Sequence, residues 1–200
     1  QKEGIVLRRH DGISARTVDQ FNLPPAYTEG RPFAGLLADD ADRDGRQEVV
    51  AVTSHRDGTH WRLWLLDLEA QEIRGDVILP IFPERREDGR WDGVYFPVAA
   101  LPAAGRPRPL VLLICAVAHD VHGRGLLAVD ALAGEVVWRR HLDASPMYTR
   151  SAVADLGHDG RHEVIALTQA TDNLAGARLH GVSDDSLRIH VLTDTGEILW

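Results

Sequence analysis

The sequence predicts an all-β protein built from a repeated unit of four antiparallel strands, and three observations support this fold class. Short apolar runs of strand length alternate with turn residues throughout the 200 residues. No segment shows the period of an amphipathic helix. Two kinds of segment, an acidic loop between apolar runs and a hairpin with a central turn, alternate along the chain at intervals of about sixty residues.

The acidic loop at residues 40–48 is the element around which the first unit is arranged. Four acidic side chains fall at its first, third, fifth and ninth positions: Asp40, Asp42, Asp44 and Glu48. Gly45 at the sixth position allows a sharp turn, and the carbonyl at the seventh position can complete a shell of oxygen donors. Ca²⁺ prefers such donors, and the apolar runs at 33–38 and 49–52 suit buried strands. The loop therefore predicts a calcium site between two strands.

An EF-hand and a metal-free turn are the two alternatives to a calcium site carried by strands. An EF-hand requires a bidentate acid at the twelfth position, which is Ala51 here, and it requires flanking helices. The valines that follow the loop favour a strand instead. A solvated acidic turn without metal stays open, because Asp and Gly are common turn residues.

The acidic loop recurs twice along the chain with fewer acids. At residues 155–163 the first, fifth and ninth positions are acidic, whereas Gly157 stands where the first loop has Asp42. The retained acids are Asp155, Asp159 and Glu163. Residues 100–108 hold the equivalent place in the second unit without any acidic residue. We therefore expect a weaker or empty site in the third unit, while the second loop keeps the strand frame without the ligands.

A predicted hairpin follows each loop. Residues 128–138 have the pattern of a strand, a turn and a returning strand, and residues 191–200 and 65–73 repeat it. Residues 5–15 form a further predicted hairpin with an Asp-Gly turn. Each cycle thus supplies four strands, which we name A to D. The single domain 1–200 divides into a hairpin and linker at 1–32 and four-stranded units at 33–80, 94–142 and 147–200.

Four-stranded units repeated without helices indicate a β-propeller, in which each blade buries its faces against its neighbours. Three cycles and one hairpin amount to about three and a half blades, fewer than an ordinary closed ring contains. Three explanations are open: residues that lie outside this sequence, an open arc, or a homodimer in which two chains complete one ring.

Composition argues against several classes of partner. The net charge of −8 is unsuited to a nucleic-acid surface. The longest apolar stretch, residues 109–118, is about half as long as a membrane-spanning helix needs to be. The one cysteine, Cys115, lies in that stretch, where we expect a buried side chain, and it cannot form an intrachain disulfide. No secretory signal opens the sequence, so we expect that one was cleaved or that the sequence is a piece of a longer protein.

The motifs resemble those of known repeat families. The loop 40–48, followed by Val49 and Val50, resembles the calcium loop of FG-GAP and VCBS repeats, which form propeller blades in integrin α-chain heads and many bacterial surface proteins. Residues 128–138, with the spacing A-x-D-x-x-x-G-x-x-x-W, are similar to the tryptophan-docking motif of quinoprotein (PQQ-type) propellers. Together these motifs cover most of residues 30–200.

The resemblance implies a role for each matching residue. In the first loop it implies that Ca²⁺ is bound by the side chains of Asp40, Asp42, Asp44 and Glu48 and by the carbonyl of Arg46. In the third unit the matching groups are the side chains of Asp155, Asp159 and Glu163 and the carbonyl of Arg161. Trp138 and Trp200 are expected to pack on the adjacent blade. Quinone binding is not implied, because the alcohol dehydrogenases of that class use an adjacent cysteine pair and this chain has one cysteine.

Candidate binding residues fall on the face opposite the calcium loops. The B–C loops at 54–60, 118–125 and 169–186 and the D–A connections are longer and more polar than the hairpin turns, and such loops commonly carry binding residues. Their polar and aromatic residues are His55, Arg56, Asp57, His60, His119, Asp120, His122, Arg124, Asp172, Asn173, Arg178, His180, Asp184 and Asp185, with Tyr27, Trp91, Tyr95, Tyr148 and Arg150. His119 and His122 could bind zinc, but spacing fixes no third ligand. No nucleophile with a base partner appears in the sequence.

The sequence thus leads to one main expectation and two alternatives. We expect a calcium-stabilised β-propeller that is extracellular, periplasmic or on the cell surface and that acts as a binding module for a protein or glycan on its B–C and D–A loops. The first alternative is a fragment or relative of a propeller carbohydrate-active enzyme, such as a polysaccharide lyase. The second is a structural sensor domain within a larger protein.

Overall fold

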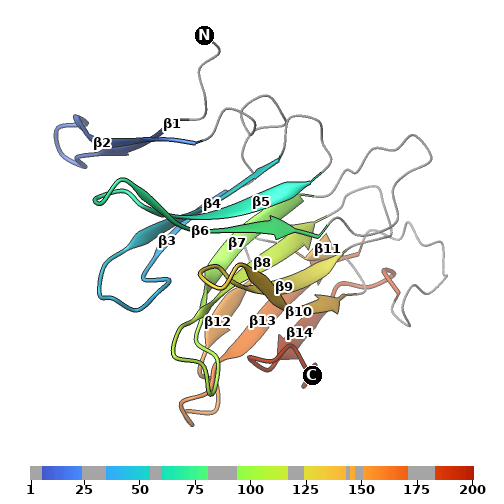
Figure 1. The fold of residues 1–200 in the computed structure, drawn as a ribbon. Helices are drawn as coiled ribbons and strands as arrows, with labels where there is room; N and C mark the ends of the chain where they lie inside the picture. The colour runs from blue at the N-terminus through green and yellow to red at the C-terminus, as the bar shows by residue number, and fades with distance from the viewer. Residues whose placement is uncertain are drawn as a thin grey trace.

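The computed structural model of the chain describes residues 6–23, 35–54, 60–80, 94–116, 124–142, 145–146, 151–170 and 183–200. These residues form strands, turns and loops, and the predicted all-β class is confirmed for them (Figure 1). Nowhere in these segments does a helix occur that has the length and apolar character needed to cross a bilayer.

The first sheet is a two-stranded hairpin of β1 (Val6–His10) and β2 (Thr17–Asn22). Its turn is wider than the Asp-Gly turn that the sequence predicts. The carboxylate of Asp11 accepts hydrogen bonds from the backbone N–H groups of Ile13 and Ser14, at 3.1 and 2.6 Å, and the N–H of Asp11 donates to the carbonyl of Arg16. The carboxylate therefore orders a six-residue connection, and the second strand begins later than expected.

The second sheet is an antiparallel meander of four consecutive strands. These are β3 (Gly35–Asp39), β4 (Glu48–Ser54), β5 (Trp61–Asp67) and β6 (Glu72–Leu79). The two central strands are apolar on both faces, as expected of strands that are covered on both sides. The predicted A-to-D order of this unit is confirmed, and β3 and β4 flank the acidic loop.

The third sheet repeats this order, and the fourth departs from it. The third consists of β7 (Val94–Leu101), β8 (Leu110–Ala116), β9 (Gly125–Asp130) and β10 (Glu135–His141). The fourth consists of β11 (Ser145–Pro146), β12 (Ala152–Ala154), β13 (Glu163–Gln169) and β14 (Ile189–Leu192). The two short strands β11 and β12 both pair with β13 and together take the place of the A strand, and β14 pairs with β13 as the C strand. In the fourth sheet the predicted returning strand is short, because Ile198 makes only an isolated bridge with Leu192.

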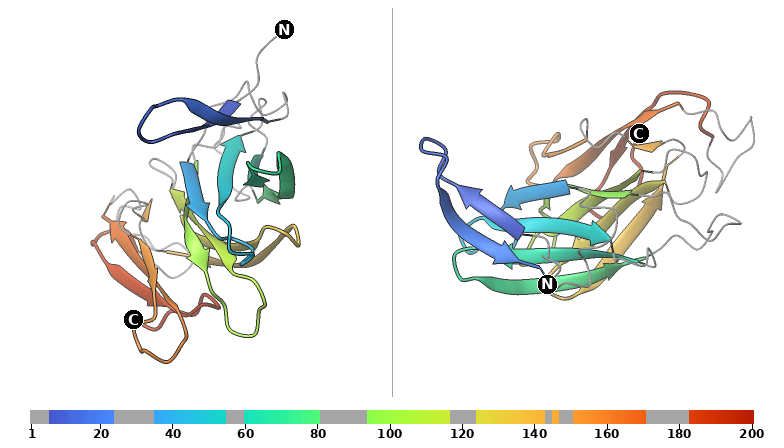
Figure 2. Two further views of the ribbon diagram at one scale, coloured as in Figure 1. Left: turned by 90° about the vertical axis from the view of Figure 1, so that its left-hand side faces the viewer. Right: turned by 90° about the horizontal axis from the view of Figure 1, so that it is seen from above.

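Consecutive sheets lie face to face (Figure 2). Three clusters of buried apolar side chains fill the spaces between them. Leu7, Phe21 and Leu23 of the hairpin segment pack on Ala51, Trp64 and Leu66 of the second sheet. The opposite face of the second sheet packs on the third sheet, and the third packs on the fourth. The A strands of successive sheets are neighbours, since β3 contacts β7 and β7 contacts β12. The sheets therefore form a stack whose A strands lie along one side.

Trp138 links the third sheet to the fourth, as predicted. Its indole Nε1 donates a hydrogen bond to the carbonyl of Asp194 at 2.9 Å. The ring lies directly on Gly196, where an added Cβ would come within 2.8 Å of ring atoms. Trp200, for which the sequence predicts the same packing, is instead 72% exposed. Of the two tryptophans expected to pack on an adjacent sheet, Trp138 therefore does so, whereas Trp200 is exposed.

Most of the predicted ligand loops fall outside the described residues. This applies to His55, Arg56, Asp57, His119, Asp120, His122, Asp172, Asn173, Arg178, His180, Tyr27, Trp91, Tyr148 and Arg150. The A–B loops and the C–D turns are described, and they are the parts from which a site can be built.

Candidate metal centre

The loop at residues 40–48 joins β3 to β4 through a tight, internally hydrogen-bonded turn. Its backbone takes the left-handed conformation at Arg43, with φ of 61°, and at Gly45, with φ of 88°. The N–H of Gly45 donates to Asp40 Oδ2 at 3.2 Å, and the N–H of Asp44 donates to Asp42 Oδ1 at 3.1 Å. Carboxylates that accept local backbone N–H groups hold such turns in shape. The loop is therefore shaped by the same acidic residues that the sequence assigns to a metal.

Three of the four predicted side-chain ligands converge. One carboxylate oxygen each from Asp40, Asp42 and Glu48 lies within 4.8 Å of the others. The side chain of Asp42 is 4% exposed and Glu48 is 1% exposed. Asp40 Oδ1 is buried and has no hydrogen-bond partner. A buried carboxylate oxygen without a partner is costly, and a bound cation would remove that cost.

The charge of the cluster acts on Glu48. Burial raises the pKa of Glu48 above its usual 4.5, and the carboxylates of Asp42, Asp44 and Asp40 raise it further. The N–H of Ala41 donates to Glu48 Oε2 at 3.0 Å, which opposes that shift. The acids therefore repel one another where they meet, and a divalent cation between them would convert this repulsion into attraction.

Asp44, the fourth predicted side-chain ligand, is turned toward two arginines. Its Oδ2 lies 2.8 Å from Arg46 Nη2 and 3.2 Å from Arg74 Nη1, and its Oδ1 accepts the N–H of Arg46 at 2.9 Å. These hydrogen bonds, above all those from Arg46, lower the pKa of Asp44 to about 2. Asp44 is thus already neutralised by guanidinium groups and lies outside the three-carboxylate cluster.

Arg74 is a part of the site that local sequence reasoning missed. It lies on β6, the D strand of the same sheet, and its Nη2 is 3.0 Å from Asp42 Oδ2. Both Arg74 and Arg46 also approach Asp67 Oδ2, at 3.7 and 3.8 Å. No motif marks Arg74, because only the sheet brings residue 74 beside the loop. The loop acids and Asp67 still outnumber the two arginines, so the site retains negative charge.

The equivalent loop of the fourth sheet, residues 155–163, has the same turn without the same cluster. Asp155 Oδ2 accepts the N–H of Gly160 at 3.0 Å, and Glu163 Oε2 accepts the N–H of Leu156 at 2.9 Å. Asp155 Oδ1 also accepts the N–H of Asp159, at 3.1 Å. In the described part of the chain, the only three acids whose oxygens converge for a metal are those of the first loop. Coordination by Asp155, Asp159, Glu163 and the Arg161 carbonyl therefore stays a prediction, as does coordination by the Arg46 carbonyl.

The loop of the third sheet contains no acids and is held by aspartates that lie outside it. The backbone N–H of Ala104 donates to Asp194 Oδ2 of the fourth sheet, and Arg106 Nη1 lies 3.4 Å from Asp130 Oδ2. This loop therefore keeps the strand frame of the first loop, as the sequence predicts, but uses neighbouring side chains to order it.

Two residues expected on an exposed ligand face are buried instead. Arg124 and Asp184 are 2% and 1% exposed and form an ion pair of 2.8 Å between the start of β9 and the segment before β14. Placing them on a binding loop is therefore wrong, because each neutralises the other inside the protein.

Tyr95 is likewise buried, and its hydroxyl donates to the carbonyl of Pro80. Cys115 is buried, as predicted, and burial raises the pKa of its thiol.

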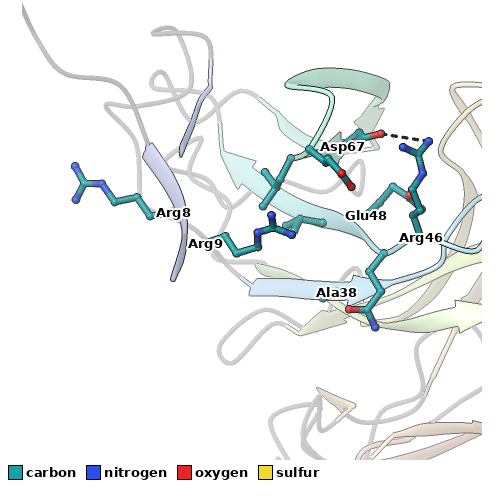
Figure 3. A pocket seen from close by; sticks show the side chains of 10 residues that line it. Arg8, Arg9, Ala38, Arg46, Glu48 and Asp67 are labelled. Atoms are coloured by element: carbon teal, nitrogen blue, oxygen red, sulfur yellow. Dashed lines mark ion pairs between the residues drawn. The ribbon is translucent and has the colours of Figure 1, made fainter. Parts of the chain in front are cut away.

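A pocket of about 510 Å³ lies between the hairpin and the base of the acidic loop at residues 40–48 (Figure 3). It is lined by Arg8, Arg9, Ala38, Arg46, Gln47, Glu48, Val49, Asp67, Leu68 and Glu69. Arg46 and Asp67 form an ion pair across part of it, and Glu48 forms part of its wall (Figure 3). The pocket and the acidic cluster therefore share Glu48. No local pattern predicts the pocket, because its walls come from separate sheets.

Comparisons with protein-family models, with curated proteins and with solved structures find no match to the chain in any of the three.

Proposed function

We propose that the chain is part of a calcium-stabilised β-propeller that works outside the cytoplasm as a binding module for a protein or glycan. The observation that carries this proposal is the convergence of Asp40, Asp42 and Glu48, with one buried Asp40 oxygen that lacks a partner. In this proposal Ca²⁺ is a structural ion, and the ligand binds elsewhere on the blades.

The propeller is supported by the repetition of antiparallel sheets that pack face to face, two of which are complete four-stranded meanders. In a propeller the A strands lie nearest the axis and each blade contacts the next. The contacts of β7 with both β3 and β12 agree with that arrangement. Trp138 adds a link between the edges of two sheets. A hydrogen bond of 3.1 Å from the N–H of Ala100 to Asp39 Oδ2 adds one between two A strands.

Calcium is the ion that best suits the loop. The donors are carboxylate oxygens, which hard cations prefer, and the cluster contains neither histidine nor cysteine. Ca²⁺ also accepts irregular coordination by six to eight oxygens, whereas Mg²⁺ requires a nearly ideal octahedron and usually keeps several waters. The ion would bind Asp40, Asp42 and Glu48, neutralise their charge and tie the end of β3 to the start of β4.

The role of the ion is passive in this proposal. In this proposal Ca²⁺ holds β3 and β4 together at the end that carries the acidic loop. Because the two strands pair along their length, their opposite ends are restrained as well, and the D–A and B–C loops continue from those ends. Ordered loops bind with a smaller loss of conformational entropy than loose ones. The calcium site would therefore raise affinity for a ligand without touching it.

The first experiment is a thermal melt of the metal-free chain with increasing CaCl₂. At a free concentration of 100 times Kd, binding stabilises the folded state by about 2.7 kcal/mol, which corresponds to a rise in Tm of roughly 5–10 °C for a chain of this size. The matched control is Glu135→Gln in the third sheet, an exposed acid outside both acidic loops, which should keep the full rise. An unchanged melt at saturating Ca²⁺ would refute the calcium site.

The second experiment separates a binding module from an enzyme. Calcium-loaded chain is applied to an array of polysaccharides and oligosaccharides, and any glycan that binds is then incubated with the chain and analysed for cleavage. Binding without new reducing or unsaturated ends supports the module. Cleavage of a bound glycan would favour the polysaccharide-lyase alternative instead.

A further inference from the structure

Both carboxylate oxygens of Asp42 are engaged by protein groups. Oδ1 accepts the N–H of Asp44 at 3.1 Å, and Oδ2 lies 3.0 Å from Nη2 of Arg74. The side chain of Asp42 is 4% exposed, so water contributes little to the solvation of its charge. A metal cation at Asp42 and the guanidinium of Arg74 would be like charges on one carboxylate. Coordination of calcium by Asp42 therefore favours the departure of Arg74 from Oδ2.

Asp67 lies within reach of an Arg74 side chain that leaves Asp42. Nη1 of Arg74 is 3.7 Å from Asp67 Oδ2, about 1 Å longer than a charge-assisted hydrogen bond. The same nitrogen is 3.2 Å from Asp44 Oδ2, but that oxygen already accepts two hydrogen bonds from Arg46. Arg46 lies farther from Asp67, at 3.8 Å from Oδ2. Asp67 is therefore the carboxylate on which Arg74 can gain a closer contact by a small movement.

The turn that follows β5 holds Asp67 in position. Its Oδ1 accepts the N–H of Ala70 at 2.8 Å, and its side chain is 8% exposed. Its Oδ2 faces the arginines at the edge of the pocket, where Figure 3 shows its ion pair with Arg46. A buried carboxylate gains from a close cationic partner, because little water solvates its charge. Asp67 can therefore accept a guanidinium without a change in its own backbone.

The third sheet shows the corresponding aspartate paired with an arginine. Asp130, like Asp67, is the last residue of a C strand, and its Oδ1 accepts the N–H of Ala133 at 2.9 Å. Its Oδ2 lies 3.4 Å from Nη1 of Arg106, which belongs to an A–B loop without acids. An aspartate at this position therefore pairs with a guanidinium where the loop offers no competing carboxylate.

We propose that Asp67 is the acceptor to which Arg74 moves when calcium binds, and that this exchange sets the calcium affinity of the loop 40–48. The exchange presupposes the calcium site of the proposed function and adds a means of regulating it. Arg74 lowers the affinity because it competes for Asp42. Asp67 raises the affinity because it stabilises the guanidinium after release. The affinity of the loop is therefore controlled from β5 and β6 as well as by its own acids.

The test is a double-mutant cycle on calcium affinity, measured by calorimetric titration of the whole chain. Asp67→Asn removes the charge but keeps an oxygen for the N–H of Ala70. In the wild-type background it should weaken calcium binding about threefold to tenfold. In the Arg74→Met background, which itself binds calcium more tightly, it should change the affinity less than about twofold. The matched control is Glu72→Gln, an exposed acid at the start of β6, which should change the affinity less than about twofold in both backgrounds.

The position of Arg74 in crystals of the calcium-loaded chain is a readout that does not depend on affinity. Nη1 of Arg74 should lie about 2.8 Å from Asp67 Oδ2, and Nη2 should no longer contact Asp42. Circular dichroism checks that each variant is folded. The crystallographic measurement decides the question if Asp67→Asn fails to fold.

Two outcomes would overturn the exchange. In one, Asp67→Asn changes calcium affinity by the same factor in both backgrounds, which would show that Asp67 acts without Arg74. In the other, Arg74 stays on Asp42 in the calcium-loaded chain. Both outcomes leave the calcium site itself intact. A wild-type chain that binds no calcium would instead remove the site and the exchange together.

Discussion

The loops at residues 40–48 and 155–163 share one backbone conformation and differ at one acidic position. Both have a left-handed residue at the fourth position, Arg43 or His158, and a left-handed glycine at the sixth. In both, the glutamate at the ninth position accepts the N–H of the second residue, at 3.0 Å in the first loop and 2.9 Å in the other. The residues that both loops share are therefore sufficient to form the turn, and the turn does not require a cluster of three acids.

The difference lies in where one backbone N–H is directed. In the first loop Asp42 accepts the N–H of Asp44, which leaves Asp40 Oδ1 without a partner. In the other loop Gly157 offers no carboxylate, so Asp159 N–H donates to Asp155 Oδ1, and both oxygens of Asp155 are engaged. The aspartate at the third position thus contributes twice: it brings its own oxygen, and it frees an oxygen of the first aspartate.

The largest effect is expected from Asp42→Gly, which converts the first loop into the pattern of the other. We expect the N–H of residue 44 to move to Asp40 and the calcium response to disappear. At a Ca²⁺ concentration that gives the wild type its full stabilisation, the variant should melt roughly 5–10 °C lower than the wild type. The measurement is a pair of melts with and without CaCl₂. A variant that keeps the wild-type response would show that Asp42 is not a ligand.

The reverse change, Gly157→Asp, should build a second site. The nearest atoms to a Cβ at residue 157 are those of the Asp159 carboxylate, from 3.7 Å, which is ordinary van der Waals contact, so the substitution fits without a clash. We expect a calcium-dependent rise in Tm beyond that of the wild type, by a few degrees. Differential scanning calorimetry measures it, with Gly157→Asn as the control that adds bulk without charge. If the two variants behave alike, charge at this position does not create a site.

The pH dependence tests the cluster without metal. The pKa of Glu48 is raised in the folded protein, so the folded state keeps its proton at pH values where the unfolded state has lost it. Glu48 therefore has no effect on stability below its unfolded pKa, and it destabilises metal-free protein increasingly as pH rises through the folded pKa. Glu48→Gln should gain stability relative to the wild type from about pH 4.5 to pH 7. Metal-free melts of both proteins across this range measure it, and a constant difference would contradict the raised pKa.

The smallest effect is expected from Arg74→Met, which removes the guanidinium beside Asp42 and Asp44. In metal-free protein we expect a loss of at most about 1 kcal/mol, because partly exposed ion pairs contribute little. Calcium should bind more tightly, because Arg74 no longer competes for Asp42. Calorimetric titration measures the change, and Arg106→Met serves as the control in a loop without acids. Weaker calcium binding in Arg74→Met would show that Arg74 supports the site instead of competing with it.

The repeating fold could be predicted because its signals are local. Runs such as residues 110–116 are long enough for one strand, and turns such as that at Gly134 mark where the chain reverses. The order of strands in the second and third sheets follows from these local signals. The short returning strand after β14 and the wide turn after β1 were not predicted, because their backbone hydrogen bonds depend on side chains such as Asp11 and on neighbouring strands.

The candidate site was predicted only as far as one loop reaches. Spacing was sufficient to bring Asp40, Asp42 and Glu48 together. It did not indicate that Arg46 and Arg74 would neutralise Asp44, since Arg74 comes from a strand thirty residues away. The burial of Arg124 with Asp184 has the same origin, because residues that form polar loops in sequence can pair across two sheets.

The calcium content of the purified chain is the most direct test of the metal centre. Metal-free protein is equilibrated with CaCl₂, passed through gel filtration at a fixed free concentration, and analysed by mass spectrometry for bound metal. One ion per chain is expected for the wild type, none for Asp42→Gly and two for Gly157→Asp at saturating calcium. A wild-type chain that binds no ion, or that binds the same number as Asp42→Gly, would contradict the proposed site.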